Sequence, residues 1–345
     1  SLCQSVLPPC NGESLPMLLP DARHGTIAAP LEHGHFGTKF HASPDGGASW
    51  EERARPAYPP TPARSPEVVN PVNQRPIPWD LKKFWALEPG ASEGELWCGT
   101  LPGGLFHSTD HGASWQLNES LWRHPGRDSW FGGGADWPGI HTILVDPRDK
   151  RRLLLAVSCG GIWESRDNGA SWENIGEGIR AEFMPPDQAY DPGIQDAHRI
   201  AWSPANPESI WMQHHNGIFH SANGGKNWRE IENAVPSAFG FAVAVHPQDP
   251  QTAWFVPGIK DELRVPCDAA LSVMRTRDGG ATFEAVRAGL PQQHAYHLVY
   301  RHSLDVSSDG QTLAFGSTTG SVWISVDSGD SWQRLSDELP PVYCV

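Results

Sequence analysis

Long apolar runs are missing from this 345-residue chain, and so are runs with the spacing of an amphipathic helix. No apolar run approaches the roughly 18 residues that cross a bilayer, so we expect no membrane-spanning segment. Without helix-period runs, an all-β architecture is the simplest prediction. The 35 Gly, 32 Pro and 16 Trp residues suit many short strands joined by tight turns.

Basic charge is also scarce. The chain has 26 Lys and Arg against 40 Asp and Glu, which gives a formal net charge of −14, and no basic block interrupts it. This balance argues against nucleic acid and anionic membranes as partners. A carbohydrate, another small polar ligand or a protein remains open, and the oligomeric state cannot be predicted.

The cysteines lack the spacing of a metal site, so we predict no metal and no other cofactor. They are Cys3, Cys10, Cys98, Cys159, Cys267 and Cys344. Cys98 and Cys159 fall within or at the end of predicted inner strands, where we expect buried thiols. Such thiols favour a reducing compartment, and we predict a cytoplasmic location. Export stays open if a leader is missing from the sequence, and Cys3 could then pair with Cys10.

What the chain does contain is one short phrase repeated six times, Ser-x-Asp-x-Gly-x-x-Trp or a near copy. The copies start 65, 57, 56, 55 and 49 residues apart. They span residues 43–50, 108–115, 165–172, 221–228, 276–283 and 325–332. A period of this size predicts an array of similar units that bury a core by stacking on one another.

Each copy has the chemistry of a strand–turn–strand connection. Asp167 can accept hydrogen bonds from backbone N–H groups a few residues on, and Gly169 supplies a backbone conformation that other residues avoid. Trp172 then begins the next strand and can cover the turn. We therefore interpret the phrase as structural, and look for function elsewhere.

The repeat resembles the Asp-box, or BNR, repeat of sialidase-like β-propellers, and the resemblance covers about residues 14–345. Residues 145–149 (Val-Asp-Pro-Arg-Asp) and 245–250 (Val-His-Pro-Gln-Asp-Pro) are similar to a bacterial subgroup labelled glycosyl hydrolase or exo-α-sialidase. The resemblance implies a propeller of four-stranded antiparallel blades. It says less about activity, because hydrolases, sorting receptors and assembly factors share the repeat.

We predict one β-propeller domain over residues 1–345, with residues 1–13 as an extension. The strand patterns give six blades, near residues 14–53, 80–118, 141–176, 198–232, 240–287 and 296–336. After the last repeat, residues 341–345 are predicted to form a further strand of the type that begins a blade. In related sequences such a strand joins an N-terminal blade, so seven blades is the alternative.

Blade topology separates two edges of each sheet. The Asp-boxes join strands three and four on the lower edge, whereas the long insertions all enter strand one on the upper edge or lie beside it. The insertions are residues 54–80, 118–140, 176–197 and 257–270. Long loops gathered on one side of a rigid scaffold are where binding and catalysis usually occur.

Histidines recur at this upper edge. His141 and His198 start strand one at aligned positions in neighbouring blades, and His297 starts the equivalent strand of the last blade. His214 and His215 follow in the fourth blade, with Arg199 and Tyr296 nearby. An imidazole can act as an acid, a base or a metal ligand near neutral pH. Hydrogen bonding to water and neighbouring carbonyls is the first interpretation, and an acid–base or substrate-contact role is the second. A metal site is the least favoured, because the spacing lacks a local metal signature.

Carboxylates and tryptophans share the same loops. Glycoside hydrolysis needs two acidic groups across a sugar, and we take Asp136 and Asp196 as catalytic candidates beside His141, His198 and His297. Aromatic faces pack on sugar rings, so Trp122, Trp130 and Trp137 are candidate substrate contacts. His214, His215, Arg199 and Tyr296 complete the candidate binding set.

Two classes of function remain open. One is a glycoside hydrolase or related carbohydrate-active propeller with its site on the upper edge. The other is a non-catalytic propeller that binds a protein or a glycan. True sialidase activity is disfavoured, because the resemblance would require a Phe/Tyr-Arg-Ile-Pro motif and residues 75–78 read Arg-Pro-Ile-Pro instead.

Overall fold

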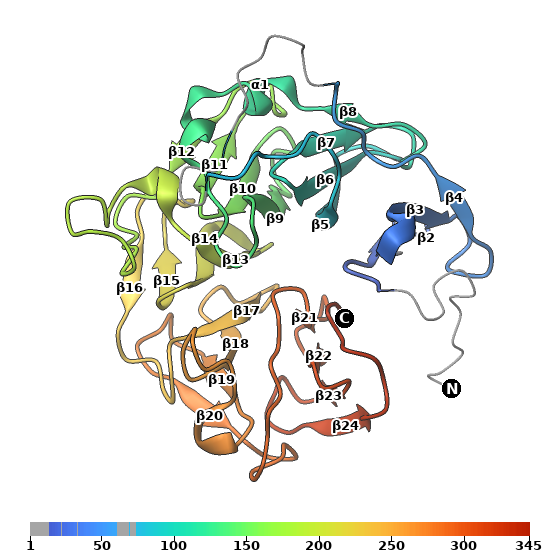
Figure 1. Cartoon of the computed structure of the whole chain (residues 1–345). Helices are drawn as coiled ribbons and strands as arrows, with labels where there is room; N and C mark the ends of the chain where they lie inside the picture. The colour runs from blue at the N-terminus through green and yellow to red at the C-terminus, as the bar shows by residue number, and fades with distance from the viewer. Residues whose placement is uncertain (1–13, 22, 33, 61–68, 70–73) are drawn as a thin grey trace. The chain divides into compact units, whose positions relative to one another are not determined.

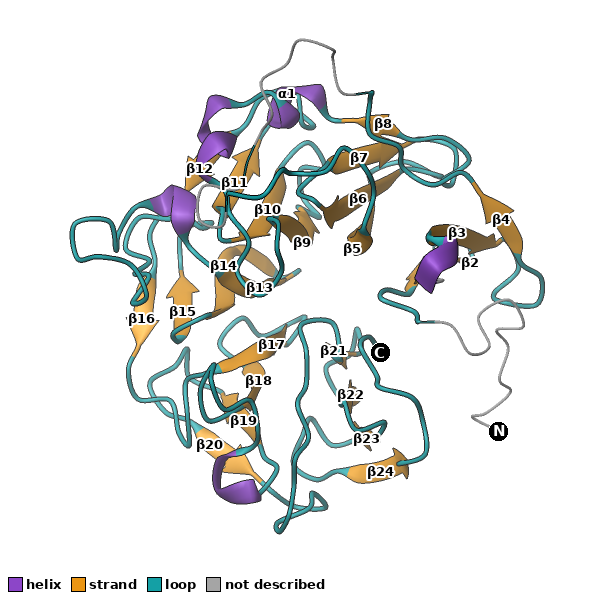
Figure 2. Cartoon of the chain, viewed as in Figure 1, coloured by secondary structure: helices purple, strands orange, loops and turns teal. Residues whose placement is uncertain are grey.

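Short strands carry most of the regular structure in the computed structural model of this chain (Figures 1 and 2). The structure describes residues 14–21, 23–32, 34–60, 69 and 74–345. Among these, α1 (Glu119–Trp122) is the one α-helix, and single-turn 3₁₀ helices occur at Gly34–Phe36, Pro125–Ser129, Pro192–Ile194 and Cys267–Ala269. No helix in the described part is long and apolar enough to cross a membrane. The predicted extension and its Cys3 and Cys10 lie outside the described residues.

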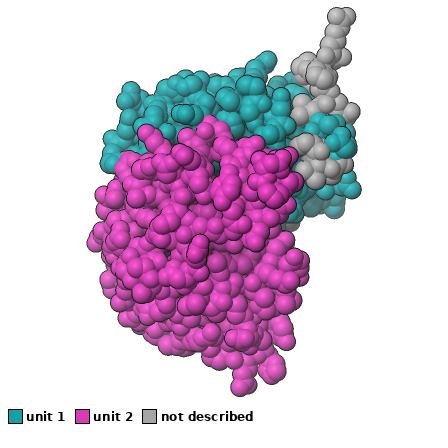
Figure 3. Space-filling model, turned by 90° about the vertical axis from the view of Figure 1, so that its left-hand side faces the viewer, with its two compact units in different colours: residues 1–173 teal, residues 174–345 magenta. Residues whose placement is uncertain are grey.

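The chain divides into two compact units, residues 1–173 and residues 174–345 (Figure 3). The first unit carries three four-stranded antiparallel sheets, each with its strands in sequence order. They are β1 (Leu19–Asp21), β2 (Thr26–Glu32), β3 (Thr38–Ser43) and β4 (Glu51–Arg53); β5 (Lys83–Pro89), β6 (Leu96–Leu101), β7 (Leu105–Ser108) and β8 (Gln116–Leu117); and β9 (Gly139–Val145), β10 (Leu153–Ser158), β11 (Gly161–Ser165) and β12 (Glu173–Ile175). The division between the units falls inside β12.

The second unit repeats the same plan three times. Its sheets are β13 (Ala197–Ser203), β14 (Asn206–His214), β15 (Ile218–Ser221) and β16 (Arg229–Ile231); β17 (Gly240–Val245), β18 (Ala253–Pro257), β19 (Val273–Thr276) and β20 (Glu284–Val286); and β21 (Leu304–Val306), β22 (Leu313–Gly316), β23 (Val322–Ser325) and β24 (Gln333–Ser336). These six sheets confirm the predicted all-β propeller with six four-stranded blades. Whether the chain folds as one domain stays a prediction.

The sixth sheet begins later than predicted. Residues 295–301 are mostly apolar and aromatic, as in a strand, and the sequence analysis therefore placed His297 at the start of strand one. The structure instead starts that strand at Leu304, seven residues further on. At the other end, the predicted strand over residues 341–345 makes only a single parallel bridge, between Cys344 and His302. The C-terminal segment thus stays with the sixth sheet, and the described residues form no seventh four-stranded sheet.

The core lies between neighbouring sheets within each unit. In the first unit, Trp97 of β6 and Trp163 of β11 are buried in one cluster with Leu153 of β10. In the second, Trp254 of β18 and Trp323 of β23 share another cluster with Leu304 of β21. Each sheet alone would leave these rings exposed, so burial against a neighbour is what stabilises the repeat. Cys98 and Cys159 are buried as predicted, and the four described cysteines form no disulfide with one another.

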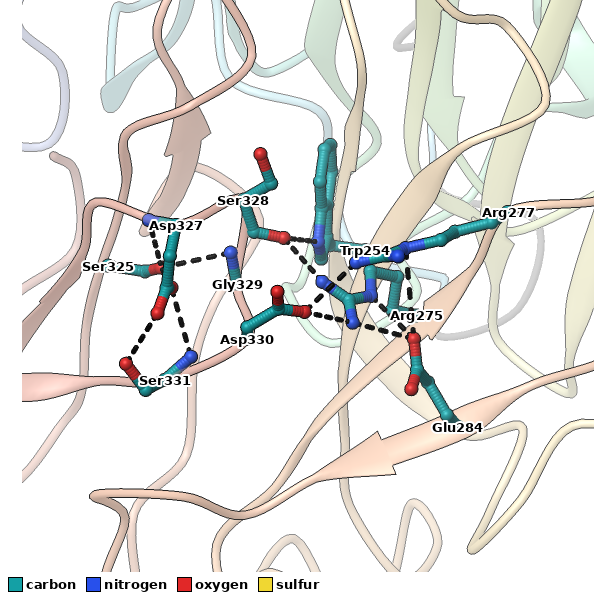
Figure 4. Close-up of polar contacts among 10 residues, drawn as sticks. All are labelled: Trp254, Arg275, Arg277, Glu284, Ser325, Asp327, Ser328, Gly329, Asp330 and Ser331. Atoms are coloured by element: carbon teal, nitrogen blue, oxygen red, sulfur yellow. Dashed lines mark hydrogen bonds and ion pairs between the residues drawn. The ribbon is translucent and has the colours of Figure 1, made fainter.

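The repeated phrase forms the turn between strands three and four, as predicted. Figure 4 shows the sixth copy. Asp327 accepts hydrogen bonds from the Ser331 backbone N–H (3.0 Å), the Ser331 hydroxyl (2.6 Å) and the Ser325 hydroxyl (2.6 Å). The Ser325 oxygen in turn accepts from the Gly329 N–H at 2.9 Å, and this bond is the buried one. The carboxylate closes the outer part of the turn and the first Ser closes the inner part.

The fourth copy keeps this geometry with a different pair of residues. Asn223 takes the place of Asp, and its Oδ1 still accepts from the backbone N–H of Asn227 at 3.0 Å. Its Nδ2 donates to Asn227 Oδ1 at 2.8 Å, where the other copies have a Ser or Thr hydroxyl donating to a carboxylate. The two positions have changed together, so the turn retains both hydrogen bonds without a charge.

The turn also fastens its sheet to the preceding one. Arg275 of β19 donates to the Ser328 carbonyl and to Asp330, both at 2.6 Å, and to Glu284 at 2.7 Å (Figure 4). Trp254 Nε1 donates to the same Ser328 carbonyl at 3.2 Å. The lower edge of the fifth and sixth sheets is therefore held by specific hydrogen bonds as well as by apolar packing.

We predict that Gly329→Ala destabilises the second unit by about 2–4 kcal/mol. Gly329 has φ +84°, which alanine adopts only with strain, and a Cβ there would lie 2.8 Å from Trp254 Nε1. Gly217→Ala is the matched control, because its Cβ meets only the Glu230 carboxylate at 3.5 Å. Urea unfolding measures both variants. Equal stability of the two would contradict the close contact between turn and ring.

The turn carboxylates also predict a pH dependence. The Ser325 and Ser331 hydroxyls lower the pKa of Asp327 from 3.8 to about 2. A lowered pKa stabilises the fold fully above 3.8, and this contribution disappears as the pH falls toward about 2. Asp327→Asn should flatten that part of the stability profile, measured by urea unfolding across the acid range. Asn223→Asp should steepen it, and unchanged profiles in both variants would rule the explanation out.

Candidate functional site

One buried acid and two histidines meet at the upper edge of the fourth sheet. Asp196 directly precedes β13, His198 is its second residue, and His215 directly follows β14. Ala197 pairs with His214 across the two strands, and the His215 N–H donates to the Asp196 carbonyl at 3.0 Å. A register shift between Ala197 and Arg199 brings the His198 side chain to the same edge.

The three side chains converge on one carboxylate oxygen. Asp196 Oδ2 lies 3.7 Å from His198 Nε2 and 3.5 Å from His215 Nδ1. Asp196 and His198 are only 3% and 2% exposed, whereas the His215 side chain is 25% exposed. A ligand can therefore reach the cluster through His215. His198 Nδ1 donates to the Gly240 carbonyl at 2.7 Å, which fixes its ring.

The electrostatics of the cluster follow from this burial. Burial would raise the pKa of Asp196, but interaction with His198 and His215 and the charge of Arg301 hold that pKa well below its usual range. Asp196 raises the pKa of His215 in return. Burial lowers the pKa of His198 despite the nearby carboxylate. The cluster thus combines a buried acid whose pKa is lowered with one imidazole whose pKa is raised and one whose pKa is lowered.

Aromatic rings support the two imidazoles. Phe241 of β17 stacks on His198 with ring centres 4.4 Å apart and an interplanar angle of 12°. Phe239 contacts both histidine rings edge-on. Phe183, which is exposed, packs against His215 at 5.1 Å. These contacts hold the imidazoles in place and give the open side of the cluster an apolar border.

Two arginines, Arg264 and Arg301, lie near the Phe241 ring. The guanidinium carbon of Arg264 is 5.3 Å from the Phe241 ring centre, and that of Arg301 is 5.4 Å away. Arg264 is also paired with Asp261. Arg199 donates to the Arg301 carbonyl and to His302 Nδ1, the latter at 3.2 Å. The predicted binding residue Arg199 therefore holds the segment that carries Arg301.

The other predicted residues of this unit lie apart from the Asp196 carboxylate or face inward. His214 is fully buried, burial lowers its pKa to about 3, and its Nε2 lacks a hydrogen-bond partner among the described residues. His297 bonds Thr319 at 2.5 Å and packs on Trp323. Tyr296 is exposed. His214 is thus a buried residue next to the cluster, and His297 packs against the sixth sheet through Trp323.

The predicted residues of the first unit occupy several separate surroundings. His141 is buried beside Trp85 and bonds the Thr142 hydroxyl at 3.0 Å. Asp136 is exposed and pairs with Arg75 at 2.9 Å. Trp130 is 1% exposed and packs on Trp163, so its ring is part of the core and offers no open face to a sugar. Any catalytic role of His141 and Asp136 stays a prediction.

The two remaining tryptophans are partly exposed. Arg127 lies 3.6 Å from the ring centre of Trp122, which also contacts Tyr58 and Trp79. Trp137 Nε1 donates to the Pro76 carbonyl at 3.0 Å. Both rings are held by loop contacts, and their binding of a sugar stays a prediction.

Sequence reasoning missed several members of the site. Tyr300, whose ring centre lies 5.0 Å from that of Phe241, was missed because the start of β21 was placed seven residues too early and its segment was predicted as a strand. Phe241 is the second residue of β17, the position that His198 has in β13. Its stacking partner could have been anticipated from that alignment, since first strands of adjacent sheets lie side by side. The contacts of Arg264 and Arg301 with Phe241 join distant segments of the chain, so no local signal predicts them.

A pocket of about 260 Å³ lies on the opposite, lower edge of the first and second sheets. Its charged lining groups already have partners in the protein. Asp21 binds Arg23 at 2.7 Å, Glu95 binds His107 at 2.8 Å, and Arg53 donates to the His111 carbonyl at 2.6 Å. It offers less unsatisfied chemistry than the Asp196 cluster, which is therefore the stronger candidate.

No family model matches the chain. Among curated proteins it is 26% identical over 148 residues to xyloglucanase Xgh74A of Acetivibrio thermocellus, covering 37% of this chain and 16% of that protein. It is 24% identical over 293 residues to a xyloglucanase of Hypocrea jecorina, covering 69% and 32%. The chain thus spans under a third of the length of these relatives.

Solved structures show the same fold. The GH74 xyloglucanase from Xanthomonas campestris matches with a TM-score of 0.62 at 16% identity, over 93% of this chain and 46% of that one. A structure of YCF48 bound to D1 peptide matches with a TM-score of 0.55 at 15% identity, over 96% and 84%. This chain is therefore similar in fold both to parts of larger hydrolases and to most of a peptide-binding propeller.

Proposed function

We propose that this chain is a carbohydrate-active propeller, a glycoside hydrolase or a close relative, that binds a glycan at the upper edge of its second unit. The observation that carries the proposal is the contact of the partly exposed His215 with the buried Asp196 carboxylate at 3.5 Å. The similarity to xyloglucanases supports a β-glucan such as xyloglucan as the first substrate to test. We also assign the six repeats to the Asp-box group.

The geometry suits an imidazole as the proton donor. Asp196 faces Nδ1 of His215, so it orients the ring and leaves Nε2 on the side away from the carboxylate. A protonated His215 would donate to the glycosidic oxygen as the bond from carbon to oxygen breaks, and water would supply the new hydroxyl. Asp196 itself is buried and held ionised, which makes it a poor acid.

A second carboxylate lies close enough to act on His215. Asp261, in the loop between β18 and β19, contributes to the raised pKa of His215 and is held by Arg264. Its position makes it our candidate for the group that orients the attacking water. Phe183 and the open side of His215 would receive the sugar, because an aromatic face packs well on a pyranose ring.

Sialidase activity fits these residues less well. Binding a sialic acid carboxylate needs arginines whose guanidinium groups point at the ligand in a bidentate manner. Arg199 is committed to the Arg301 carbonyl, and Arg264 to Asp261. Arg199 and Arg264 are therefore already engaged by the protein.

We predict that His215→Ala lowers hydrolysis of xyloglucan oligosaccharides by about 10²–10⁴-fold, the usual contribution of a positioned acid or base. Release of reducing ends gives the rate, and calorimetry gives the affinity. The control is His220→Gln, since His220 packs on Trp211 and bonds Ser209 away from the cluster. An unchanged rate in His215→Ala, with His220→Gln also active, would refute the assigned role.

A peptide-binding module is the second candidate, and a specific observation favours it. Large apolar side chains are exposed on several upper-edge loops of the second unit, namely Phe183, Tyr190, Val235, Leu263 and Tyr296. The similar fold of YCF48, which is matched over most of its length, is compatible with such a role. Binding of extended peptides with no binding or cleavage of any glycan would decide for this candidate.

A further inference from the structure

Three potential metal ligands from one sheet edge point at a common space. They are Asp196 Oδ2, His198 Nε2 and His215 Nδ1, and all three atoms lie within 4.8 Å of one another. They come from both sides of the β13–β14 pair, which is fixed by backbone hydrogen bonds. The group is therefore held by rigid strands and does not depend on a long loop.

The proton positions favour a cation between these atoms. A carbonyl oxygen only accepts hydrogen bonds, so the 2.7 Å contact with Gly240 places a proton on Nδ1 of His198. Nε2 of His198 is then the nitrogen that faces Asp196 Oδ2, which lies 3.7 Å away. Metal-bound histidines generally have this arrangement, in which the second nitrogen donates to a carbonyl.

The distances fit metal ligands better than hydrogen bonds. Charge-assisted hydrogen bonds have lengths of about 2.7–2.9 Å, clearly shorter than the 3.5 and 3.7 Å observed here. Ligands bound at about 2.0–2.2 Å in a tetrahedron lie about 3.3–3.6 Å apart. The two distances to Asp196 are nearer to this value than to the spacing of about 3 Å in an octahedral site, and the His198 Nε2–His215 Nδ1 pair lies within 4.8 Å.

We propose that Asp196, His198 and His215 bind one divalent transition-metal ion of the zinc class. Two imidazoles and one carboxylate suit zinc, iron or nickel, whereas calcium and magnesium prefer sites made of oxygen. The partly exposed side at His215 leaves room for water as a fourth ligand.

This inference does not depend on the proposed substrate. With an ion bound, Asp196 and His215 serve as its ligands, and the acid–base role of His215 would pass to a metal-bound water. Metal content can be measured on the protein alone, without any glycan. Metal binding without glycan cleavage would refute the proposed function and keep this site, whereas glycan cleavage by a protein that takes up no Zn²⁺ would do the reverse.

The test is to strip the full chain with a chelator and titrate it with Zn²⁺ by calorimetry. We expect about one equivalent to bind. Asp196→Asn and His215→Gln should each abolish stoichiometric binding, whereas the control His220→Gln should keep it. Circular dichroism of each variant shows that it is folded. Loading with Co²⁺ should give the visible absorption of a tetrahedral site in the wild type and not in Asp196→Asn.

Two results would overturn the proposal. One is a folded wild-type protein that takes up no Zn²⁺ or Co²⁺. The other is stoichiometric uptake that persists in both Asp196→Asn and His215→Gln, because the ion would then be bound by other residues. If His215→Gln fails to fold, Asp196→Asn alone still decides between these outcomes, since it keeps the size of the side chain.

Discussion

The contact between a turn glycine and an aromatic ring of the preceding sheet is the constraint on which the rest of this structure depends. A Cβ added at Gly169 would lie 3.2 Å from Trp97, one at Gly280 would lie 3.2 Å from Trp211, and one at Gly329 would meet Trp254 at 2.8 Å. Gly112 stands in the same relation to Phe40. Each pair joins consecutive sheets within one unit. The repeated phrase therefore closes its own turn and at the same time sets the spacing between sheets, which explains why it recurs with so little change.

Because the lower edge is fixed in this way, the upper edge is free to vary. The loops there differ in length from sheet to sheet, and their residues can be chosen for chemistry instead of packing. The Asp196 cluster shows the result. Its members sit at the ends of β13 and β14, so the rigid strands fix their positions, while Phe183 and Arg264 arrive from loops. A precise centre with adaptable surroundings is the usual arrangement of a ligand site on a repeat scaffold.

The sequence was most informative where structure depends on neighbouring residues. The predicted third and fourth blades, residues 141–176 and 198–232, begin and end within two residues of the observed sheets. The repeated turn phrase marks these positions directly. The prediction failed at residues 295–301. These residues are mostly apolar and aromatic, which is typical of a strand, but no strand forms there. Strand pairing depends on a partner that the local pattern does not reveal. For the site, Asp196, His198 and His215 could be named from loop position. Contacts between distant segments decide which of these residues meet. They bring Asp196 together with His198 and His215 and place His297 against Trp323.

The whole chain carries a large negative charge, whereas the site holds groups of both signs, and this difference bears on the ligand. The net charge of −14 would attract a basic peptide at long range. At the cluster, however, the buried Asp196 carboxylate lies near His215 and Arg301, and Asp261 is paired with Arg264. Such a mixed set of donors and acceptors can exchange hydrogen bonds with the hydroxyl groups of a neutral sugar. The local charges therefore give a basic peptide no specific advantage over a glycan at this site.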